Sequence, residues 1–183
     1  MNKRLPITTF MACTVLVLTG CGKSVSKEDA GKFIEENYTS KEEKTFNVHI
    51  VSNVEKADGI YSLLFKVGKE TSDKTDKVAP ITKLDLAVYS ADYFKFTLKG
   101  KKLVVSYNIK NIKDFMKSMG EDASSIPEDA KFDGSSSGEY VYDENGYPES
   151  YTVKANVSLE YSYAGVSISG AIKMSEEAKY TAK

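Results

Sequence analysis

The stretch YTVKANVSLEY, residues 151–161, has the most regular pattern in the chain. Apolar or aromatic side chains occupy each odd position from Tyr151 to Tyr161, and polar side chains occupy each even position. Because successive side chains of a strand point to opposite faces, this period of two places all the apolar groups on one face. The segment therefore predicts a long strand of an antiparallel sheet with one dry face and one wet face.

Turn signals on both sides extend this strand into hairpins. Asn145-Gly146, the strongest two-residue hairpin signal, precedes it, and Ala164-Gly165 follows it. Pro148 indicates that the strand begins at an edge or out of register with its neighbour. The same alternation predicts seven further strands, which cover residues 46–50, 61–67, 84–88, 94–98, 103–109, 139–142 and 166–174.

Three polar stretches are expected to connect these strands. Asp58-Gly59 is a turn signal, so the strands before and after it are expected to form a hairpin. Residues 68–80 are rich in lysine and acidic side chains and predict a solvated loop. The serine-rich residues 134–138 likewise predict a flexible loop.

Two segments have a helical period instead. Ser26 is the predicted N-cap of the first helix, with Asp29 three residues later. A second helix is expected to begin at Lys110 or Asn111 and to stop at Gly120. The sequence therefore predicts an α+β fold, a single domain built mainly from a curved antiparallel β-sheet of about eight strands with two short helices.

The N-terminal segment has the order of features that an export signal requires. Lys3 and Arg4 form a basic start, and residues 7–18 form an apolar stretch that is too short to cross a bilayer as a helix. Gly22-Lys23-Ser24 also matches the end of a phosphate-binding loop, but the first glycine of that motif would fall on Val17. An export signal is therefore favoured over a nucleotide site.

The end of this segment, Leu18-Thr19-Gly20-Cys21, resembles the lipobox of bacterial lipoproteins. The resemblance implies that a diacylglyceryl group is attached to the sulfur of Cys21 and that the signal peptide, residues 1–20, is cut off between Gly20 and Cys21. Residues 21–26 are then the lipidated cysteine with a short tether, and residues 27–183 are a β-rich extracytoplasmic domain. The expected location is the outer face of the bacterial cell membrane, or the outer membrane if the cell has two.

Composition limits the function of this domain. The only other cysteine, Cys13, lies in the signal, so disulfides and thiol chemistry are excluded for residues 27–183. Arg4 is the only arginine and the formal net charge is −1, so the domain lacks the guanidinium groups that recognise phosphates and bases. Nucleic-acid binding is therefore not expected, and the expected partners are the membrane and an envelope protein or a lipid ligand.

Two short helices are expected to leave part of an eight-stranded apolar face uncovered. This layout resembles the curved-sheet, half-barrel lipoproteins and lipoprotein carriers of bacterial envelopes. The resemblance implies a pocket for acyl chains, and the residues of the second helix that would line it are Phe115, Met116 and Met119. A filled core without a cavity is the alternative.

Tyrosine is abundant, with twelve residues in the chain. Half-buried strand positions suit tyrosine, because its ring packs while its hydroxyl group stays wet. The functional alternative is an aromatic patch for a protein partner, peptidoglycan or glycan, and its expected members are Tyr140, Tyr142 and Tyr161.

Patterns for catalysis and metal binding are weak. Residues 134–138, GSSSG, match the G-x-S-x-G motif of hydrolases, but they lead into a strand and the only histidine, His49, lies upstream. A single histidine without cysteines is a poor metal site, and the acidic turn 143–146 lacks the later ligands of a calcium loop. We therefore expect no enzyme, cofactor or metal, but a lipid-anchored accessory lipoprotein that acts by binding, with an acyl-chain carrier as the alternative.

Overall fold

The computed structural model describes residues 22–90, 92–118, 130–163 and 165–183. Strands are labelled β, α-helices α and 3-10 helices η. In chain order the elements are β1 (Lys23–Val25), α1 (Lys27–Asn37), β2 (Lys44–Ala57), η1 (Gly59–Leu63), β3 (Gly68–Val78), η2 (Leu84–Val88), β4 (Phe94–Lys99), β5 (Lys102–Ile109), α2 (Ile112–Ser118), β6 (Lys131–Tyr142), β7 (Pro148–Tyr163) and β8 (Val166–Ala182).

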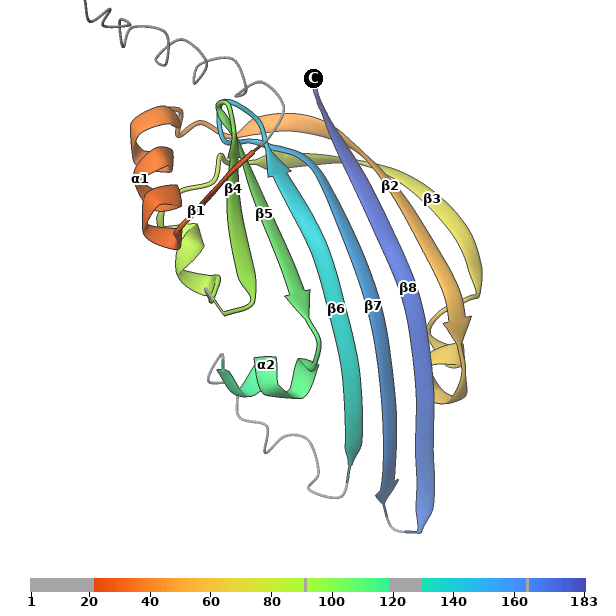
Figure 1. Ribbon diagram of the computed structural model, residues 1–183. Coiled ribbons are helices and arrows are strands. Elements are labelled where there is room, and N and C mark those ends of the chain that lie inside the picture. The colour runs from red at the N-terminus through yellow and green to blue at the C-terminus, as the bar shows by residue number, and fades with distance from the viewer. Residues whose placement is uncertain (1–21, 91, 119–129, 164) are drawn as a thin grey trace, which may run out of the picture.

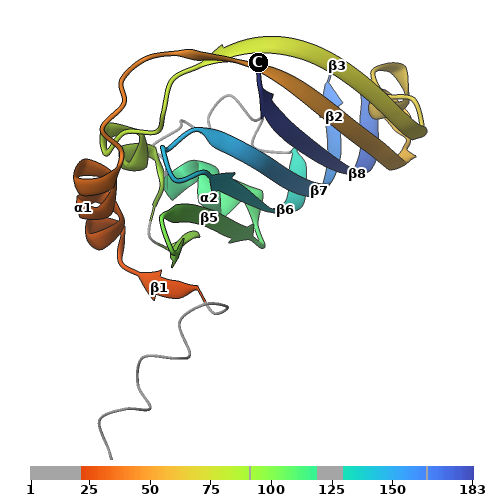
Figure 2. The same ribbon diagram turned by 90° about the horizontal axis from the view of Figure 1, so that it is seen from above.

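All eight strands belong to one antiparallel sheet with the order β1-β4-β5-β6-β7-β8-β2-β3. The long strands β6, β7 and β8 form its middle, and β1 and β3 are its two edges (Figure 1). Seen from above, the sheet is twisted and bent, but it is not strongly curled and its edges remain apart (Figure 2). The predicted fold class, a single domain with an eight-stranded antiparallel sheet and two short helices, is confirmed.

The register of the sheet separates an apolar face from a polar face. Tyr151 on β7 lies between Tyr140 on β6 and Ala178 on β8, and Ala178 in turn lies opposite Ile50 on β2. Tyr140, Ala178 and Ile50 therefore lie on the same face of the sheet as the apolar side chains at the odd-numbered positions of residues 151–161. The predicted dry face is present. The even-numbered positions of β7 point to the other face, where Thr152, Lys154, Asn156 and Glu160 are exposed.

Helix α1 covers one end of the apolar face. Ala30 and Ile34 are buried there with Phe96 of β4 and Val105 of β5. As predicted, Ser26 is the N-cap, and its hydroxyl oxygen accepts a hydrogen bond from the backbone N–H of Asp29 at 3.0 Å. A second buried cluster lies on the same face, where β2 pairs with β8, and its members are Phe46, Val48, Tyr147 and Ala178.

Strand β3 and helix η1 differ from the prediction. The strand predicted at 61–67 is absent, because residues 59–63 form η1. The strand that follows β2 and pairs with it is β3, which was expected to be a loop. Nearly all of β3 is exposed, so an edge strand that is wet on both faces has no apolar alternation to reveal it. Asp58 does form a turn, but its carboxylate accepts the backbone N–H of Ala171 at 2.6 Å and so holds η1 against β8.

The strand predicted at 84–88 is also wrong, because these residues form η2. The backbone N–H and the hydroxyl group of Thr82 both donate to the carboxylate of Asp85, at 2.6 and 2.8 Å, and this pair starts the turn. Leu86 is buried, whereas Leu84 and Val88 are exposed. Alternation of three apolar residues therefore misled the prediction, since only one of them enters the core.

The serine-rich residues 134–138 are part of β6 and do not form a loop. Ser136 lies opposite Ala155 of β7, and β6 extends from residue 131. A Cβ on Gly138 would meet the backbone oxygen of Thr152 and would lie 2.7 Å from the ring of Tyr107. Glycine at this position therefore permits a close approach of the neighbouring strands.

Part of the predicted tether belongs to the sheet. Residues 23–25 form β1, in which Lys23 lies opposite Leu98 and Val25 lies opposite Phe96 of β4. The predicted tether, residues 21–26, therefore includes a strand of the sheet and the N-cap of α1. The signal peptide, Cys21 and Met119 lie outside the described residues.

Candidate functional site

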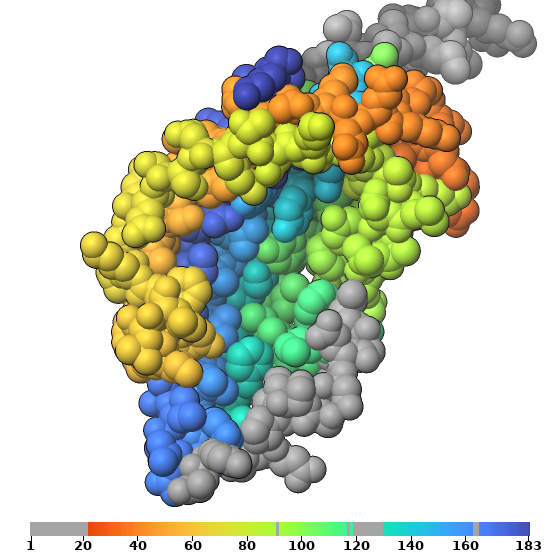
Figure 3. Space-filling model, turned by 180° about the vertical axis from the view of Figure 1, so that it is seen from behind, coloured from red at the N-terminus to blue at the C-terminus, as the bar shows by residue number. Residues whose placement is uncertain are grey.

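An open groove of about 620 Å³ lies on the apolar face of the sheet. Its floor consists of Tyr140 and Tyr142 from β6, Tyr151 from β7 and Tyr180 from β8. We call this feature the tyrosine groove. The space-filling view from behind shows the hollow between β3 on one side and the segment around η2 on the other, with the central strands at its bottom (Figure 3).

The wall of the tyrosine groove on the η2 side is apolar and exposed. Leu84 and Val88 line it, and their exposed fractions are 83% and 58%. Helix η2 turns these side chains outward while Leu86 fixes the helix in the core. Large apolar side chains that are exposed beside a groove are typical of binding surfaces.

The floor of the groove belongs to a continuous row of aromatic rings. Tyr140 lies between Tyr107, with ring centroids 6.3 Å apart, and Tyr151, at 5.8 Å. Tyr180 continues the row at 6.4 Å from Tyr151. Phe94 and Phe46 end it at 5.5 Å from Tyr107 and 6.1 Å from Tyr180. One ring from each of six neighbouring strands thus forms a rigid surface across the sheet.

The hydroxyl groups of the floor are neutral at physiological pH. Burial raises the pKa of Tyr140, Tyr142, Tyr151 and Tyr180 above the ordinary value of tyrosine. A neutral hydroxyl group can both donate and accept a hydrogen bond. The floor therefore offers apolar ring faces together with polar contacts that carry no charge.

The tyrosine groove continues toward α1. A second open groove of about 710 Å³ lies beside the C-terminal end of α1, and Ile81 and Leu84 line both grooves. Ile34 and Tyr38 are on its α1 side. Leu84 therefore stands between two hollows, at a position where a bound partner would contact it from either side.

The predicted aromatic patch is divided by the structure. Tyr140 and Tyr142 lie together in the tyrosine groove, whereas Tyr161 lies near the far end of β7, opposite Ile168 of β8. Ten residues of strand separate Tyr161 from Tyr151, which corresponds to about 33 Å. Tyr161 therefore does not contribute to the same surface.

The predicted acyl-chain lining from α2 does not face the tyrosine groove. The ring of Phe115 packs against Tyr93 and Phe94, with centroids 5.1 and 6.3 Å away. Met116 is half-buried beside it, and Met119 lies outside the described residues. Helix α2 therefore packs on the sheet at another place, beside β6, where a Cβ on Gly134 would lie 3.0 Å from Cδ1 of Ile112.

The sheet separates Ser136, the serine of the G-x-S-x-G pattern, from His49, because the two side chains lie on opposite faces. Ser136 lies in mid-strand on the apolar face, and its hydroxyl group donates to the backbone oxygen of Lys154 at 3.2 Å. His49 is exposed on the polar face, where its Nδ1 lies 2.8 Å from Asp73. The acidic turn is a hairpin turn, in which one oxygen of Asp143 accepts the backbone N–H groups of Asn145 and Tyr147.

Several groove residues were not singled out by the sequence. Tyr151 was predicted only as a strand residue, Tyr180 lies beyond the last predicted strand, and Leu84 and Val88 were assigned to a strand. Pairing across β6, β7 and β8 brings residues 140, 151 and 180 together from distant parts of the chain. The alternation of apolar and polar residues indicates which side chains of a strand face inward. It does not give the register between neighbouring strands, and the register is what brings these residues together.

No helix of the described residues is long and apolar enough to span a membrane. Comparison with protein-family models, with curated proteins and with solved structures found no match to this chain.

Proposed function

We propose that this protein is a non-catalytic lipoprotein, held at the outer face of a bacterial membrane by diacylglyceryl-Cys21, which binds an envelope partner in the tyrosine groove. The lipobox residues 18–21 support the anchor. The tyrosine groove is the observation that carries the binding function. It combines a rigid aromatic floor with the exposed side chains of Leu84 and Val88 on one wall.

The chemistry of the groove favours a protein segment or a glycan as the partner. Tyrosine is enriched among residues that dominate binding energy, because it presents a large ring that loses little conformational entropy. Neutral hydroxyl groups suit the polar groups of a peptide or sugar. The groove holds one carboxylate, that of Asp85, and this group already accepts two hydrogen bonds from Thr82.

A photo-crosslinking experiment tests this proposal. A photoreactive phenylalanine analogue is placed at Leu84, and a matched control is placed at Val166, which is 62% exposed in the turn region between β7 and β8. We expect specific crosslinks to an envelope component from position 84 and not from position 166. Equal crosslinking from both positions would show that the groove is not the binding surface.

A charge variant makes the same test independent of the photoreactive group. Leu84→Asp places a carboxylate at the groove wall, and it should abolish copurification of the partner without unfolding the domain, since Leu84 is exposed. Val166→Asp introduces the same charge outside the groove. The proposal fails if both variants retain the partner as well as the parent protein does.

An acyl-chain carrier is the second candidate. The observation that favours it is the apolar wall at Leu84 and Val88, together with the continuity of the two grooves through Ile81. Native mass spectrometry of residues 23–183, which lack Cys21, purified from the host without detergent, distinguishes the two functions. A noncovalently bound mass that resolves into lipid after denaturation supports the carrier, whereas a domain without bound lipid supports the partner-binding lipoprotein.

The anchor has its own test. Cys21→Ala removes the sulfur to which the diacylglyceryl group would be attached, so the variant should keep an uncleaved signal and lose the lipid. Mass spectrometry of the parent protein should in turn find a lipid-modified N-terminal cysteine at position 21. A parent protein without this modification would contradict the lipoprotein assignment.

A further inference from the structure

Strand β1 directly follows Gly22, so no linker separates Gly22 from the sheet. Lys23–Val25 is paired with β4, and Gly22 directly precedes this strand. A Cβ on Gly22 would lie 2.8 Å from Cγ of Lys99, so the chain still touches β4 at this point. If Cys21 carries the lipid, the β1–β4 edge lies within a few ångströms of the headgroups, since one residue spans at most about 3.6 Å.

Lysines are concentrated at this edge. The β4–β5 hairpin turns through Gly100 and Lys101, and Lys99 lies opposite Lys102. Lys102 pairs with Glu149 at 2.6 Å. The remaining lysines form no ion pair with any residue that the structure describes, and all are exposed: Lys23, Lys99 and Lys101. We call these three residues the anchor-side lysines.

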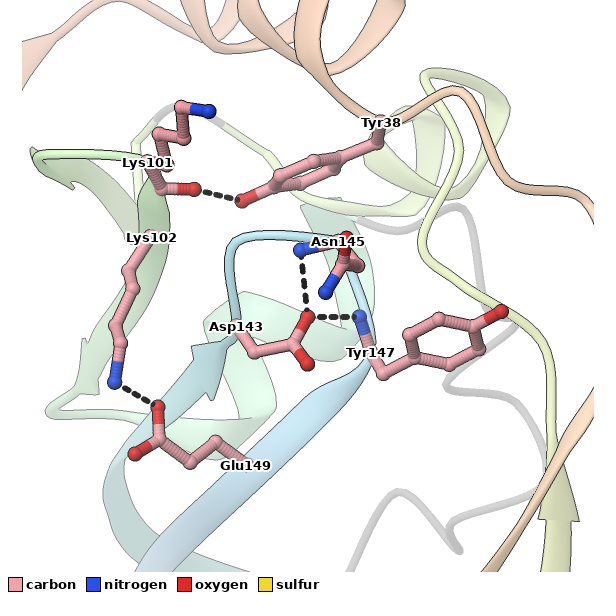
Figure 4. A network of polar contacts seen from close by, with 7 residues as sticks. All are labelled: Tyr38, Lys101, Lys102, Asp143, Asn145, Tyr147 and Glu149. Atoms are coloured by element: carbon pink, nitrogen blue, oxygen red, sulfur yellow. Dashed lines mark hydrogen bonds and ion pairs between the residues drawn. The ribbon is translucent and has the colours of Figure 1, made fainter. Parts of the chain in front are cut away.

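The hairpin that carries these lysines is held in place. The hydroxyl group of Tyr38, which follows α1, donates to the backbone oxygen of Lys101 at 3.1 Å (Figure 4). The same view shows the ammonium group of Lys101 pointing away from the carboxylates of Asp143 and Glu149. Lys99 lies directly opposite Lys102, and like charges in this position lower the stability of a hairpin. Glu149 pairs with Lys102, so Lys99 has no counter-charge among the described residues.

Acidic residues at the same end reduce but do not cancel this positive charge. Asp143 already accepts two backbone N–H groups, and Glu149 is paired with Lys102. Glu144 is exposed in the β6–β7 turn and forms no ion pair with the described residues. The three anchor-side lysines therefore outnumber the two acidic side chains of the neighbouring β6–β7 turn that form no ion pair with the described residues, Asp143 and Glu144.

We infer that the anchor-side lysines bind anionic lipid headgroups of the membrane that holds Cys21. This inference rests on the lipid anchor of the proposed function, not on the identity of the groove's partner. Two contacts, the acyl chains and the lysines, then fix how the sheet stands on the membrane. Each lysine near an anionic surface strengthens membrane binding roughly fivefold, which gives roughly a hundredfold for three.

Lysine acetylation on vesicles tests the contact. The mature protein, extracted with its lipid, is reconstituted on vesicles of phosphatidylcholine alone or with phosphatidylglycerol, and a membrane-impermeant acetylating reagent is added. We expect Lys23, Lys99 and Lys101 to react several-fold more slowly on the anionic vesicles. Lys69 and Lys77, on the opposite edge strand β3, should react equally on both. Salt at about 1 M should remove the protection, because the screening length falls to about 3 Å.

A double variant supplies the matched comparison. Lys99→Gln with Lys101→Gln should speed transfer of the protein from anionic vesicles to neutral acceptor vesicles by roughly 25-fold. Lys69→Gln with Lys77→Gln changes the net charge equally and should leave the rate unchanged. Equal rates for the two double variants, or equal acetylation on both kinds of vesicle, would overturn the inference while leaving the anchor intact. A mature N-terminus without lipid would overturn the anchor and this inference together.

Discussion

The hydroxyl group of Tyr151 donates a hydrogen bond to Oε1 of Glu176 on the neighbouring strand β8. Ser52 on β2 donates to the other oxygen of the same carboxylate at 2.9 Å. Glu176 lies on the apolar face of the sheet, opposite Val153, where an unpaired carboxylate would be costly. Donors from the strands on either side of β8 therefore allow an acidic residue to occupy this position.

Tyr151→Phe should destabilise the protein, because it leaves one oxygen of the half-buried Glu176 without its donor. Hydrogen bonds to charged groups contribute about 1.5–3 kcal/mol, and partial exposure places the expected loss near the lower end. Urea unfolding measures the change. Tyr180→Phe is the control, since the hydroxyl group of Tyr180 forms no hydrogen bond with the described residues. Equal losses in both variants would refute the role of the Glu176 contact.

Stability should fall at alkaline pH through the buried tyrosines. Burial raises the pKa of Tyr142 in the folded state, whereas the unfolded chain has the ordinary value of about 10. Above that pH the unfolded state loses the proton first, so the contribution of Tyr142 is fully present below pH 10 and is lost as the pH rises further.

Tyr142→Phe isolates this contribution from the lysines that titrate in the same range. The free energy of unfolding of the variant should fall less steeply between pH 10 and 11.5, by up to about 1.4 kcal/mol per pH unit. Urea titrations of both proteins at intervals of half a pH unit measure the two slopes. Parallel slopes would mean that the hydroxyl group of Tyr142 ionises as easily in the folded protein as in the unfolded chain.

Gly59 is expected to be the least replaceable glycine of the described turns. Its φ angle is +54°, and a Cβ would overlap the backbone of Ser169. Gly165 has a φ angle of +81° but no atom within 4 Å of its Cβ position. Gly165→Ala should cost about 1–2 kcal/mol from the backbone conformation alone. Gly59→Ala should cost about 2 kcal/mol more, because η1 must move away from β8. Similar unfolding midpoints for the two variants would contradict this packing.

The sequence predicted best where one face of a strand is dry. Residues 151–161 alternate without interruption, and the structure forms β7 over this whole segment with Pro148 at its start. The shift in register near Tyr142 agrees with the expected effect of Pro148. The N-cap at Ser26 was predicted for a similar reason, since its hydrogen bond depends on residues three positions apart.

The errors have a common physical cause. The number of predicted strands agreed with the structure, but 61–67 and 84–88 are not strands, whereas β1 and β3 were missed. Apolar alternation reports burial on one face, and Leu63 is 83% exposed in η1 although it belongs to such a pattern. Strand β3 is held by backbone hydrogen bonds to β2. Such pairing does not require apolar side chains, so the sequence pattern does not reveal it.

The candidate site depended on register even more than the fold did. Tyr140 was identified from its neighbours in the chain, but its contacts with Tyr107 and Tyr151 arise from pairing among β5, β6 and β7. Tyr161 has the same phase as Tyr151, and it was predicted to belong to one aromatic patch with Tyr140 and Tyr142. Distance along β7 separates them, and a sequence pattern that gives only the face of a strand does not give the position along it.

Strand β3 needs its charged side chains so that no further strand pairs with it at the edge of the sheet. It pairs with β2 over eleven residues without a bulge or a proline, so its outer backbone groups present a regular edge. Charged side chains are then the device that prevents another chain from adding to this edge. Lys74 and Asp76 form an ion pair at 2.8 Å within the strand.

Lys74→Val with Asp76→Val should therefore cause self-association that increases with concentration. The double change leaves the net charge unaltered, so weaker colloidal repulsion is not an explanation. Lys131→Val with Glu160→Val removes a comparable ion pair, at 3.4 Å, between β6 and β7, whose edges are already paired. Size-exclusion chromatography with light scattering should show a rising mass for the β3 variant alone. If both variants keep the mass of the parent protein, backbone geometry and not charge protects this edge.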